Sequence, residues 1–447
     1  MSSKYKMNCT VLKYKWILTI SFFIGFMMNV NAQQMLTLDE ALKLALQNNY
    51  SIQVARNDAA LAANNNQIGA AGMLPSVIGS AGQDNQVVDS KQKFLNGTEN
   101  NKTGAKNSSL TANVELGWTI FDGLKMFATK NRLGELQKVG ELRMRQNIEL
   151  TFVRVIRAYY DVMLAKQQSV ASKELADNSK NRLVLADEKF KAGKSAKTEW
   201  LKAQVDLNTD VSALMRIDNT LKNAKVNLNQ LLARDLQINF DVPDSVTNFI
   251  EYKLDDLTNK TMMQNAGILM AKKNQHISAL GLNEIRAERM PSIQLKSGYN
   301  FSNQQSQAGF LQSSQNTGFH YGAALSINLF NGFDVNRRLQ NANLAMRTSD
   351  LVYKDSVTKI QNAITQAYNN YVMSKQLIGI EMTNVAIARQ NFDISDEQYK
   401  VGVITSLELR DAQQNLLNSE LRLFNAQYET KLNETEMLRL AGDLVKF

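Results

Sequence analysis

Residues Asp396–Gln413 read DEQYKVGVITSLELRDAQ, and residues Asp187–Gln204, 209 positions earlier, read DEKFKAGKSAKTEWLKAQ. Both stretches contain Asp-Glu, an aromatic residue, a lysine, a glycine, an acidic residue and then Ala-Gln. Their flanks have helical spacing without proline, and the central glycine suits the left-handed residue that ends many helices. Ser195 or Thr405 is expected to cap the next helix. Each stretch therefore predicts the tip of a helical hairpin, so the chain contains one unit twice.

The duplication extends beyond these two tips. Met73–Val77 (MLPSV) returns 216 positions later as Arg289–Ile293 (RMPSI). Ile120–Gly123 (IFDG) returns 209 positions later as Leu329–Gly332 (LFNG). The change of offset indicates that the second copy lacks seven residues between these two points. A repeat of about 200 residues is too long for a solenoid unit and indicates an internal gene duplication.

Residues 1–32 predict a signal peptide. Lysines precede a mostly apolar run at Trp16–Val30, and Val30–Ala32 supplies small residues at the expected cleavage site. The only cysteine, Cys9, lies in this segment, so disulfides are not expected. Residues 33–447 then form a single protomer. Its two repeats are expected at 38–236 and 254–443, joined by a linker at 237–253.

The charge of the chain argues against nucleic acid as a partner. Without the four lysines of the signal peptide, 47 basic and 42 acidic residues remain, a net charge of +5 that is spread evenly. Nucleic-acid-binding domains usually concentrate a larger basic excess on one face. The hydrophobic content of 44% indicates an ordered protein.

Long helices dominate the predicted fold. Thr37 and Glu40 have the spacing of a capping box, and a helical stripe follows towards Gly72. Leu124–Lys191 and Asp334–Lys400 contain no proline. Their 68 and 67 residues predict helices roughly 100 Å long.

After Pro75 and Pro291 the hydrophobic period changes to two, which predicts four strands per chain. The same alternation fits a soluble sheet with one face on a core. The hydrophilic stretches Gln83–Ser108 and Asn303–Asn316, expected as exposed loops, favour strands that cross a membrane. The residues expected to face lipid are Leu110, Val114, Trp118, Leu325 and Ile327. The residues expected to face a lumen are Thr111, Asn113, Lys296, His320 and Asn328.

Four strands cannot close a barrel, and an open sheet edge in lipid leaves backbone groups unpaired. Two copies would supply eight strands, whose interior the side chains fill. Three copies would supply twelve strands and leave a water-filled lumen. The fold class expected is mainly α with a transmembrane β part: a duplicated helix–strand–strand–helix unit that forms a trimeric 12-stranded β-barrel.

The duplicated order, the proline joints and the Phe/Tyr-Lys-x-Gly hairpin tips resemble the TolC-type outer-membrane efflux protein family over essentially the whole mature chain. The resemblance implies a homotrimer surrounded by outer-membrane lipid. It also implies that the 12-stranded β-barrel is continued by a long α-helical barrel through the periplasm. It also implies a passive conduit from the periplasm to the outside. This conduit would be docked by a periplasmic adaptor protein to an inner-membrane transporter.

The resemblance also implies roles for residues near the tips. The hairpin tips and adaptor contacts would be Phe190, Gly193, Tyr399 and Gly402. The acidic residues that narrow the periplasmic gate would be Glu408, Asp411 and Glu199. Ile404 stands where the family has a latching arginine.

An enzyme is not expected. His276 and His320 lack the spacing of metal ligands, and no phosphate-binding loop or nucleophile elbow is present. No catalytic residue, cofactor or metal site is therefore predicted. The alternative function is a periplasmic coiled-coil adaptor or structural protein without a pore. Such a protein would not need four amphipathic strands.

Overall fold

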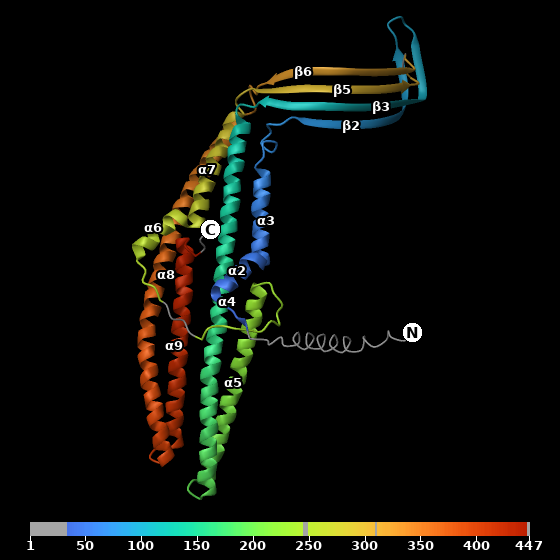
Figure 1. Ribbon diagram of the computed structural model, residues 1–447. Coiled ribbons are helices and arrows are strands. Elements are labelled where there is room, and N and C mark those ends of the chain that lie inside the picture. Colours follow the sequence, from blue (N-terminus) through green and yellow to red (C-terminus); the bar gives the residue numbers. More distant parts are fainter. Residues whose placement is uncertain (1–33, 245–248, 309–310, 445–447) are drawn as a thin grey trace, which may run out of the picture. The chain divides into compact units, whose positions relative to one another are not determined.

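The protein is described here by a computed structural model that covers residues 34–244, 249–308 and 311–444 (Figure 1). The predicted signal peptide at 1–32, with Cys9, lies outside the described residues. The chain divides into two compact units. The first contains the chain up to Asn49 with Arg154–Phe249 and Ser374–Thr430. The second contains Tyr50–Val153, Ile250–Met373 and the chain from Lys431 onward, so each unit takes segments from both predicted repeats.

The same order of six elements occurs twice along the chain. The first set is α2 (Leu38–Asn48), α3 (Tyr50–Asn65), β2 (Ser76–Lys93), β3 (Glu99–Phe121), α4 (Lys125–Lys191) and α5 (Lys197–Leu231). The second set is α6 (Leu254–Gln264), α7 (Ala266–Ala287), β5 (Ser292–Ser306), β6 (Ser313–Ser326), α8 (Asp334–Val401) and α9 (Ser406–Ala441). A short parallel pair, β1 (Gln34–Met35) with β4 (Phe240–Asp241), completes the described elements. The starts of α2, α3 and β2 return after 216 residues, and those of α4 and α5 after 209.

The predicted capping box at the start of α2 is confirmed. The Thr37 amide donates to Glu40 Oε2 at 3.0 Å, and the Glu40 amide donates to Thr37 Oγ1 at 3.3 Å. The single helix expected towards Gly72 is wrong, because Asn49 has an extended backbone between α2 and α3.

The break at Asn49 has a tertiary cause. The Asn49 side-chain amide donates to the carbonyl of Leu231 at 2.7 Å, near the end of α5. In the second repeat the Asn265 side-chain amide donates to Leu440 O at 2.9 Å, and these positions differ from the first pair by 216 and 209. Both asparagines therefore satisfy a carbonyl that the end of a helix leaves unpaired.

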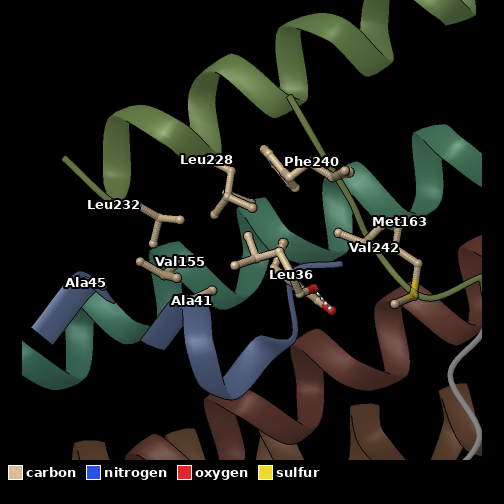
Figure 2. Close-up of a cluster of buried hydrophobic side chains, with 12 residues drawn as sticks. Leu36, Ala41, Ala45, Val155, Met163, Leu228, Leu232, Phe240 and Val242 are labelled. Atoms are coloured by element: carbon tan, nitrogen blue, oxygen red, sulfur yellow. Dashed lines mark hydrogen bonds between the residues drawn. The ribbon is translucent and has the colours of Figure 1, made fainter. Parts of the chain in front are cut away.

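Each unit has a hydrophobic cluster built from equivalent positions. In the first unit, side chains of α2, α4, α5 and the segment around β4 meet around Val155 and Leu228, both fully buried (Figure 2). In the second unit, the equivalent Ile364 and Met437 are also fully buried. Burial of each such side chain contributes about 1.5–3 kcal/mol. These clusters join the end of α5 to the middle of α4, and the end of α9 to the middle of α8.

The four long strands form one antiparallel sheet in the second unit, in the order β2-β3-β5-β6. Ser76 pairs with Gly117 in the first β-hairpin, and Ser292 pairs with Ser326 in the second. Ser292 is Ser76 plus 216 positions and Ser326 is Gly117 plus 209 positions, so the two β-hairpins have the same register. The strands are longer than expected. Most of Gln83–Ser108 is paired strand rather than loop, because polar side chains do not prevent backbone hydrogen bonds between β2 and β3.

The sheet has one mainly apolar and one mainly polar face in its paired region nearest the helices. Val114 lies opposite Tyr299, which lies opposite Phe319, and alternate residues share this apolar side. Leu110, Trp118 and Leu325 are on the same side by their strand positions. The expected lumen residues Thr111, Asn113, Lys296 and His320 lie on the other face.

Ile327 and Asn328 follow the last residue of β6, so the expectation that this strand continues through them is wrong for the single chain. β5 begins at Ser292, which pairs with Ser326, so no residue of β5 is available beyond this point.

None of the helices among the described residues combines the length and apolar content required to cross a membrane.

Candidate channel entrance

Both predicted hairpin tips are present in the first unit. Gly193 has φ +71° and Gly402 has φ +84°, the left-handed conformation expected at each tip. The Lys194 amide donates to Lys189 O at 2.8 Å, and the Val403 amide donates to Gln398 O at 2.9 Å. This is the hydrogen bond of a Schellman C-cap, which stops α4 and α8 at equivalent positions.

The second helix of each hairpin begins differently. Thr405 caps α9: the Thr405 amide donates to Glu408 Oε2 at 2.7 Å, and the Glu408 amide donates to Thr405 Oγ1 at 3.3 Å. The first helical residue of α5 follows Ala196, which provides no side-chain cap. The expectation that Ser195 caps α5 is therefore wrong. Its hydroxyl is buried without a hydrogen-bond partner, because the helix starts one position too late for it.

Two polar contacts join the tips of the first hairpin (α4 and α5) and the second hairpin (α8 and α9). Ser406 Oγ donates to Glu199 Oε2 at 2.5 Å. The Lys189 ammonium donates to Tyr399 O at 3.0 Å and lies 4.4 Å from the centre of the Tyr399 ring. The hydrogen bond from Ser406 holds the pKa of Glu199 below its usual range. Within the protomer, Glu199 therefore accepts a hydrogen bond that joins the tips of the two hairpins.

The burial of Tyr399 argues against its predicted role as an adaptor contact. It is only 8% exposed and packs with Phe392, Leu409 and Leu416. Burial raises the pKa of its hydroxyl. The exposed apolar residues of the second tip are Val401, Val403 and Leu407.

Phe190, in the first tip, is more exposed than Tyr399 and stacks on Trp200, with ring centroids 6.3 Å apart. The glycines at both tips are exposed. Gly193 and Gly402 thus keep accessible positions beside the aromatic and apolar side chains of the tips.

A buried ion pair links the hairpins further from the tips. Arg410 on α9 donates to Asp210 on α5 through two bonds of 2.5 and 2.7 Å. Ser179 on α4 donates to the same carboxylate at 2.6 Å. Burial opposes the charge on Arg410, but the Asp210 carboxylate outweighs it and raises the arginine pKa. In the sequence, Arg410 stands between the predicted gate residues Glu408 and Asp411, but no pattern connects it to Asp210. The ion pair was therefore not predicted.

A second arginine lies in the same interior. Arg182 on α4 is 3% exposed and pairs with Asp206 on α5 at 2.6 Å. Its Nε and Nη1 atoms are buried without hydrogen-bond partners. Burial lowers the pKa of Arg182. The first hairpin therefore carries a guanidinium with incomplete hydrogen bonding next to the contact between the hairpins.

The two main acidic gate candidates are both exposed. Glu408 and Asp411 lie three residues apart on α9, while Leu409 and Ala412 between them are buried. The structure brings Glu199 to Ser406 rather than to these two carboxylates. Hydrogen bonds from Thr405 lower the pKa of Glu408.

Among the described residues, no group of three or more His, Cys, Asp or Glu side chains is arranged to hold a metal ion. His320 lies on the polar face of the sheet, where its ring covers Gly298. His276 lies on the helix α7 and is not part of the sheet.

A sheet with an apolar and a polar face, joined twice to hairpins of long helices, defines a protomer of an outer-membrane channel. The profile of the outer membrane efflux protein family matches residues 41–234 and 261–443. The chain belongs to this family.

Similar proteins include an outer membrane protein and a protease secretion protein of bacteria. Outer membrane protein TolC of Vibrio cholerae is 22% identical over 303 residues, which cover 65% of this chain and 67% of the relative. Alkaline protease secretion protein AprF of Pseudomonas aeruginosa is 22% identical over 404 residues, covering 88% of this chain and 82% of the relative.

Solved structures share the fold at low sequence identity. The Campylobacter jejuni CmeC outer membrane channel superimposes with a TM-score of 0.74 at 18% identity, covering 91% of this chain and 86% of that chain. The Vibrio cholerae outer membrane protein VceC superimposes with a TM-score of 0.74 at 17% identity, covering 91% and 96% of the two chains.

The protein is an outer-membrane channel that extends into the periplasm. It works as a homotrimer with a periplasmic adaptor and an inner-membrane pump in a tripartite export system. The family consists of channels rather than enzymes. The alternative of an adaptor or structural protein without a pore is therefore wrong.

Proposed function

We propose that the two hairpin tips form the periplasmic entrance of this passive conduit, and that the Arg410–Asp210 pair holds the entrance closed. The pair is the observation that carries the proposal. It joins α9 of the second hairpin to α5 of the first through two charge-assisted hydrogen bonds. The side chain of Asp210 is 4% exposed, so few water molecules compete for it.

The Glu199–Ser406 bond supports the same role nearer the tips. Ile404 provides no charged group at the position where the family resemblance implies an arginine, and here it packs beside the cluster of Phe392 and Leu409. The latch of this chain thus relies on Arg410, six residues further along α9.

Glu408 and Asp411 are the proposed acidic gate. Both lie on the exposed side of α9, and residues three apart share one helix face. Threefold symmetry would place three copies of each carboxylate around the entrance. A ring of negative charge attracts cations and concentrates them at a constriction. The expected consequence is cation preference and block by multivalent cations.

The proposal also includes the domain boundaries and the roles of individual residues. Residues 1–32 act as the signal peptide, and repeats at 38–236 and 254–443 flank a linker at 237–253. Profile matches at 41–234 and 261–443 support these boundaries. Lipid would contact Leu110, Val114, Trp118 and Leu325 on the apolar face of the sheet, and Ile327 directly after β6. The lumen would be lined by Thr111, Asn113, Lys296 and His320 on the polar face, and by Asn328 after the end of β6. Phe190, Gly193 and Gly402 would contact the adaptor.

Bilayer conductance of the purified trimer tests the gate with charge-neutral variants. Glu408→Gln keeps the capping contact, because glutamine also serves in a capping box. The double variant Glu408→Gln/Asp411→Asn should lose block by a trivalent cation and most of its cation preference. The matched control is Glu397→Gln/Asp393→Asn on α8, which should behave as wild type. Unchanged block and selectivity in the gate variant would show that these carboxylates lie outside the conducting path.

A further inference from the structure

Two arginines beside the sheet have no carboxylate partner among the residues that the structure describes. Arg286 lies in the last turn of α7, and Arg289 lies three positions before the start of β5. Both side chains are exposed. Their hydrogen bonds go to carboxamides: Arg286 donates to Asn283 at 3.5 Å, and Arg289 donates to Asn336 at 2.5 Å. The positive charges of the two arginines are therefore not neutralised within the described chain.

The neighbouring carboxylates on the same segment are already paired with other cations. Glu284 pairs with Arg132 at 2.8 Å. Glu288 pairs with Lys125 at 3.4 Å and also with Arg338. These carboxylates are therefore engaged away from the two arginines, and an excess of positive charge remains beside the sheet.

The two arginines line one groove between α7 and α8. The groove has a volume of about 680 Å³, and the carboxamide side chains of Asn336, Gln340 and Asn343 also line it. None of the described residues that line the groove is acidic. The planar guanidinium of arginine forms paired hydrogen bonds to phosphate oxygens, and carboxamides can donate to the same oxygens. The lining therefore fits a phosphate group.

The two arginines are not needed to form the joint between helix and strand. By the offset of 216, their equivalents in the first repeat are Ala70 and Met73. A strand begins directly after the proline in both repeats, at Ser76 and at Ser292. The first joint thus forms without positive charge at these positions. This difference indicates that the arginines of the second joint have a role other than folding.

The joints lie next to the apolar face of the sheet. Trp118 belongs to this face, and its indole nitrogen donates at 3.0 Å to the carbonyl of Met73, the equivalent of Arg289. Trp118 also lies opposite Leu295 on β5, six residues after Arg289. Met290 is exposed and lines the groove beside Arg289. Arginines at the edge of an apolar surface are typical of the level where a membrane protein meets lipid headgroups.

We propose that this groove binds the phosphate group of an anionic phospholipid from the periplasmic leaflet of the outer membrane. Arg286 and Arg289 would hold the phosphate, and the acyl chains would lie against Leu295 and Trp118. The excess of positive charge favours a lipid with a net negative charge. The inference rests on the proposed lipid contact of the apolar face and adds a headgroup site to it.

Tryptophan fluorescence of the full-length trimer in lipid vesicles tests the site. The chain has three tryptophans, and Trp16→Phe/Trp200→Phe leaves Trp118 as the only one. Lipids with brominated acyl chains quench a tryptophan that they contact, so the quenching of Trp118 reports the lipid beside β3 and β5. Brominated phosphatidylglycerol should quench Trp118 more strongly than brominated phosphatidylcholine at the same mole fraction. The ratio of the two binding constants measures the preference for anionic lipid.

The variant Arg286→Ala/Arg289→Met introduces the residues of the first repeat into this background. It should lower the preference by about tenfold, since the loss of one hydrogen bond to a charged group changes an equilibrium constant by roughly this factor. The matched control is Arg216→Gln/Lys222→Gln, which removes two exposed charges from α5 in the first unit. The control should keep the full preference.

The outcomes separate the headgroup site from the lipid face. An unchanged preference in Arg286→Ala/Arg289→Met, or an equal loss in the α5 control, overturns the site. Absence of quenching by either lipid places Trp118 away from lipid and contradicts the proposed lipid face as well. Sodium phosphate and sodium chloride of equal ionic strength should have equal effects. A loss of preference in phosphate alone would show that the groove takes free phosphate, and it would overturn the assignment to a lipid headgroup.

Discussion

Arg410 and Asp210 lie 200 residues apart in sequence and form a two-bonded ion pair between α9 and α5, with distances of 2.5 and 2.7 Å. Ser179 donates to the same carboxylate and also lies 3.3 Å from Arg410 Nη1. Three helices of two hairpins thus meet at one carboxylate. Because Asp210 is buried, the attraction is screened less than on the surface. Separation of the hairpins would require this contact to break.

Asp210→Asn should therefore increase the open probability of the channel and weaken the contact between the hairpins. Removal of one partner from a buried ion pair typically destabilises a protein by about 3–5 kcal/mol. Bilayer recordings and thermal unfolding of the trimer measure the two effects. Asp187→Asn is the control, because its partner Lys191 lies one turn away on the exposed surface of α4. Surface pairs contribute about 0–1 kcal/mol. Equal effects of the two variants would contradict the latch.

The Thr405–Glu408 cap should contribute a stability that depends on pH. Bonds from Thr405 lower the folded-state pKa of Glu408, so this contribution is present above the unfolded-state pKa. It should be lost as the pH falls through the lowered folded-state pKa. Thr405→Val should lower the melting temperature of the trimer at neutral pH, and the difference from wild type should shrink in acid. Thr383→Val on α8 is the control, since Thr383 Oγ1 donates only to Gly379 O. A difference that is constant from neutral to acid pH would contradict a contribution of the Thr405 hydroxyl to the lowered pKa of Glu408.

Replacement by alanine should have opposite effects on stability at Gly402, in the tip, and at Gly379, inside α8. Gly402→Ala places a Cβ on a residue with φ +84°, and left-handed backbone costs about 1–2 kcal/mol for residues with a side chain. Gly379→Ala lies inside α8 with open space around its Cβ position, and should stabilise the helix by about 0.5–1 kcal/mol. Thermal unfolding measures both. Export should decrease only for Gly402→Ala, and membrane insertion should remain in both. A stabilising Gly402→Ala would contradict the tip geometry.

Neighbouring residues on β3 distinguish the two faces of the sheet. Val114→Arg should hinder insertion, because an arginine on the lipid face near the bilayer centre costs about 2–4 kcal/mol. Asn113→Arg, on the opposite face, should insert normally and change ion selectivity. Folding into lipid vesicles with a denaturant titration measures the cost. If Asn113→Arg were the variant that fails to insert, the lipid and lumen faces would be exchanged.

Sequence patterns alone determined the features that depend on local physical chemistry. Gly193 and Gly402 could be predicted as helix stops because left-handed backbone favours glycine, and Thr37 with Glu40 could be predicted as a capping box from their spacing. Alternation placed Val114 and Asn113 on opposite faces, since side chains alternate along any strand. The offsets 209 and 216 identified the duplication, because equivalent residues recur whether or not they touch.

Only the tertiary structure decided the features that depend on distant residues. Asn49 interrupts a helix because its side chain bonds to Leu231, 182 positions away. Tyr399 is buried because Leu409 and Leu416 return beside it after the tip. Ser195 does not cap α5, because the turn from Gly193 places the first helical residue after Ala196. In the sequence, Arg410 cannot be distinguished from an exposed arginine on a helix. It forms a buried ion pair only because α5 brings Asp210 beside it. A periodic pattern specifies which face of an element is apolar, but the partner of that face is set by the packing of segments about 200 residues apart.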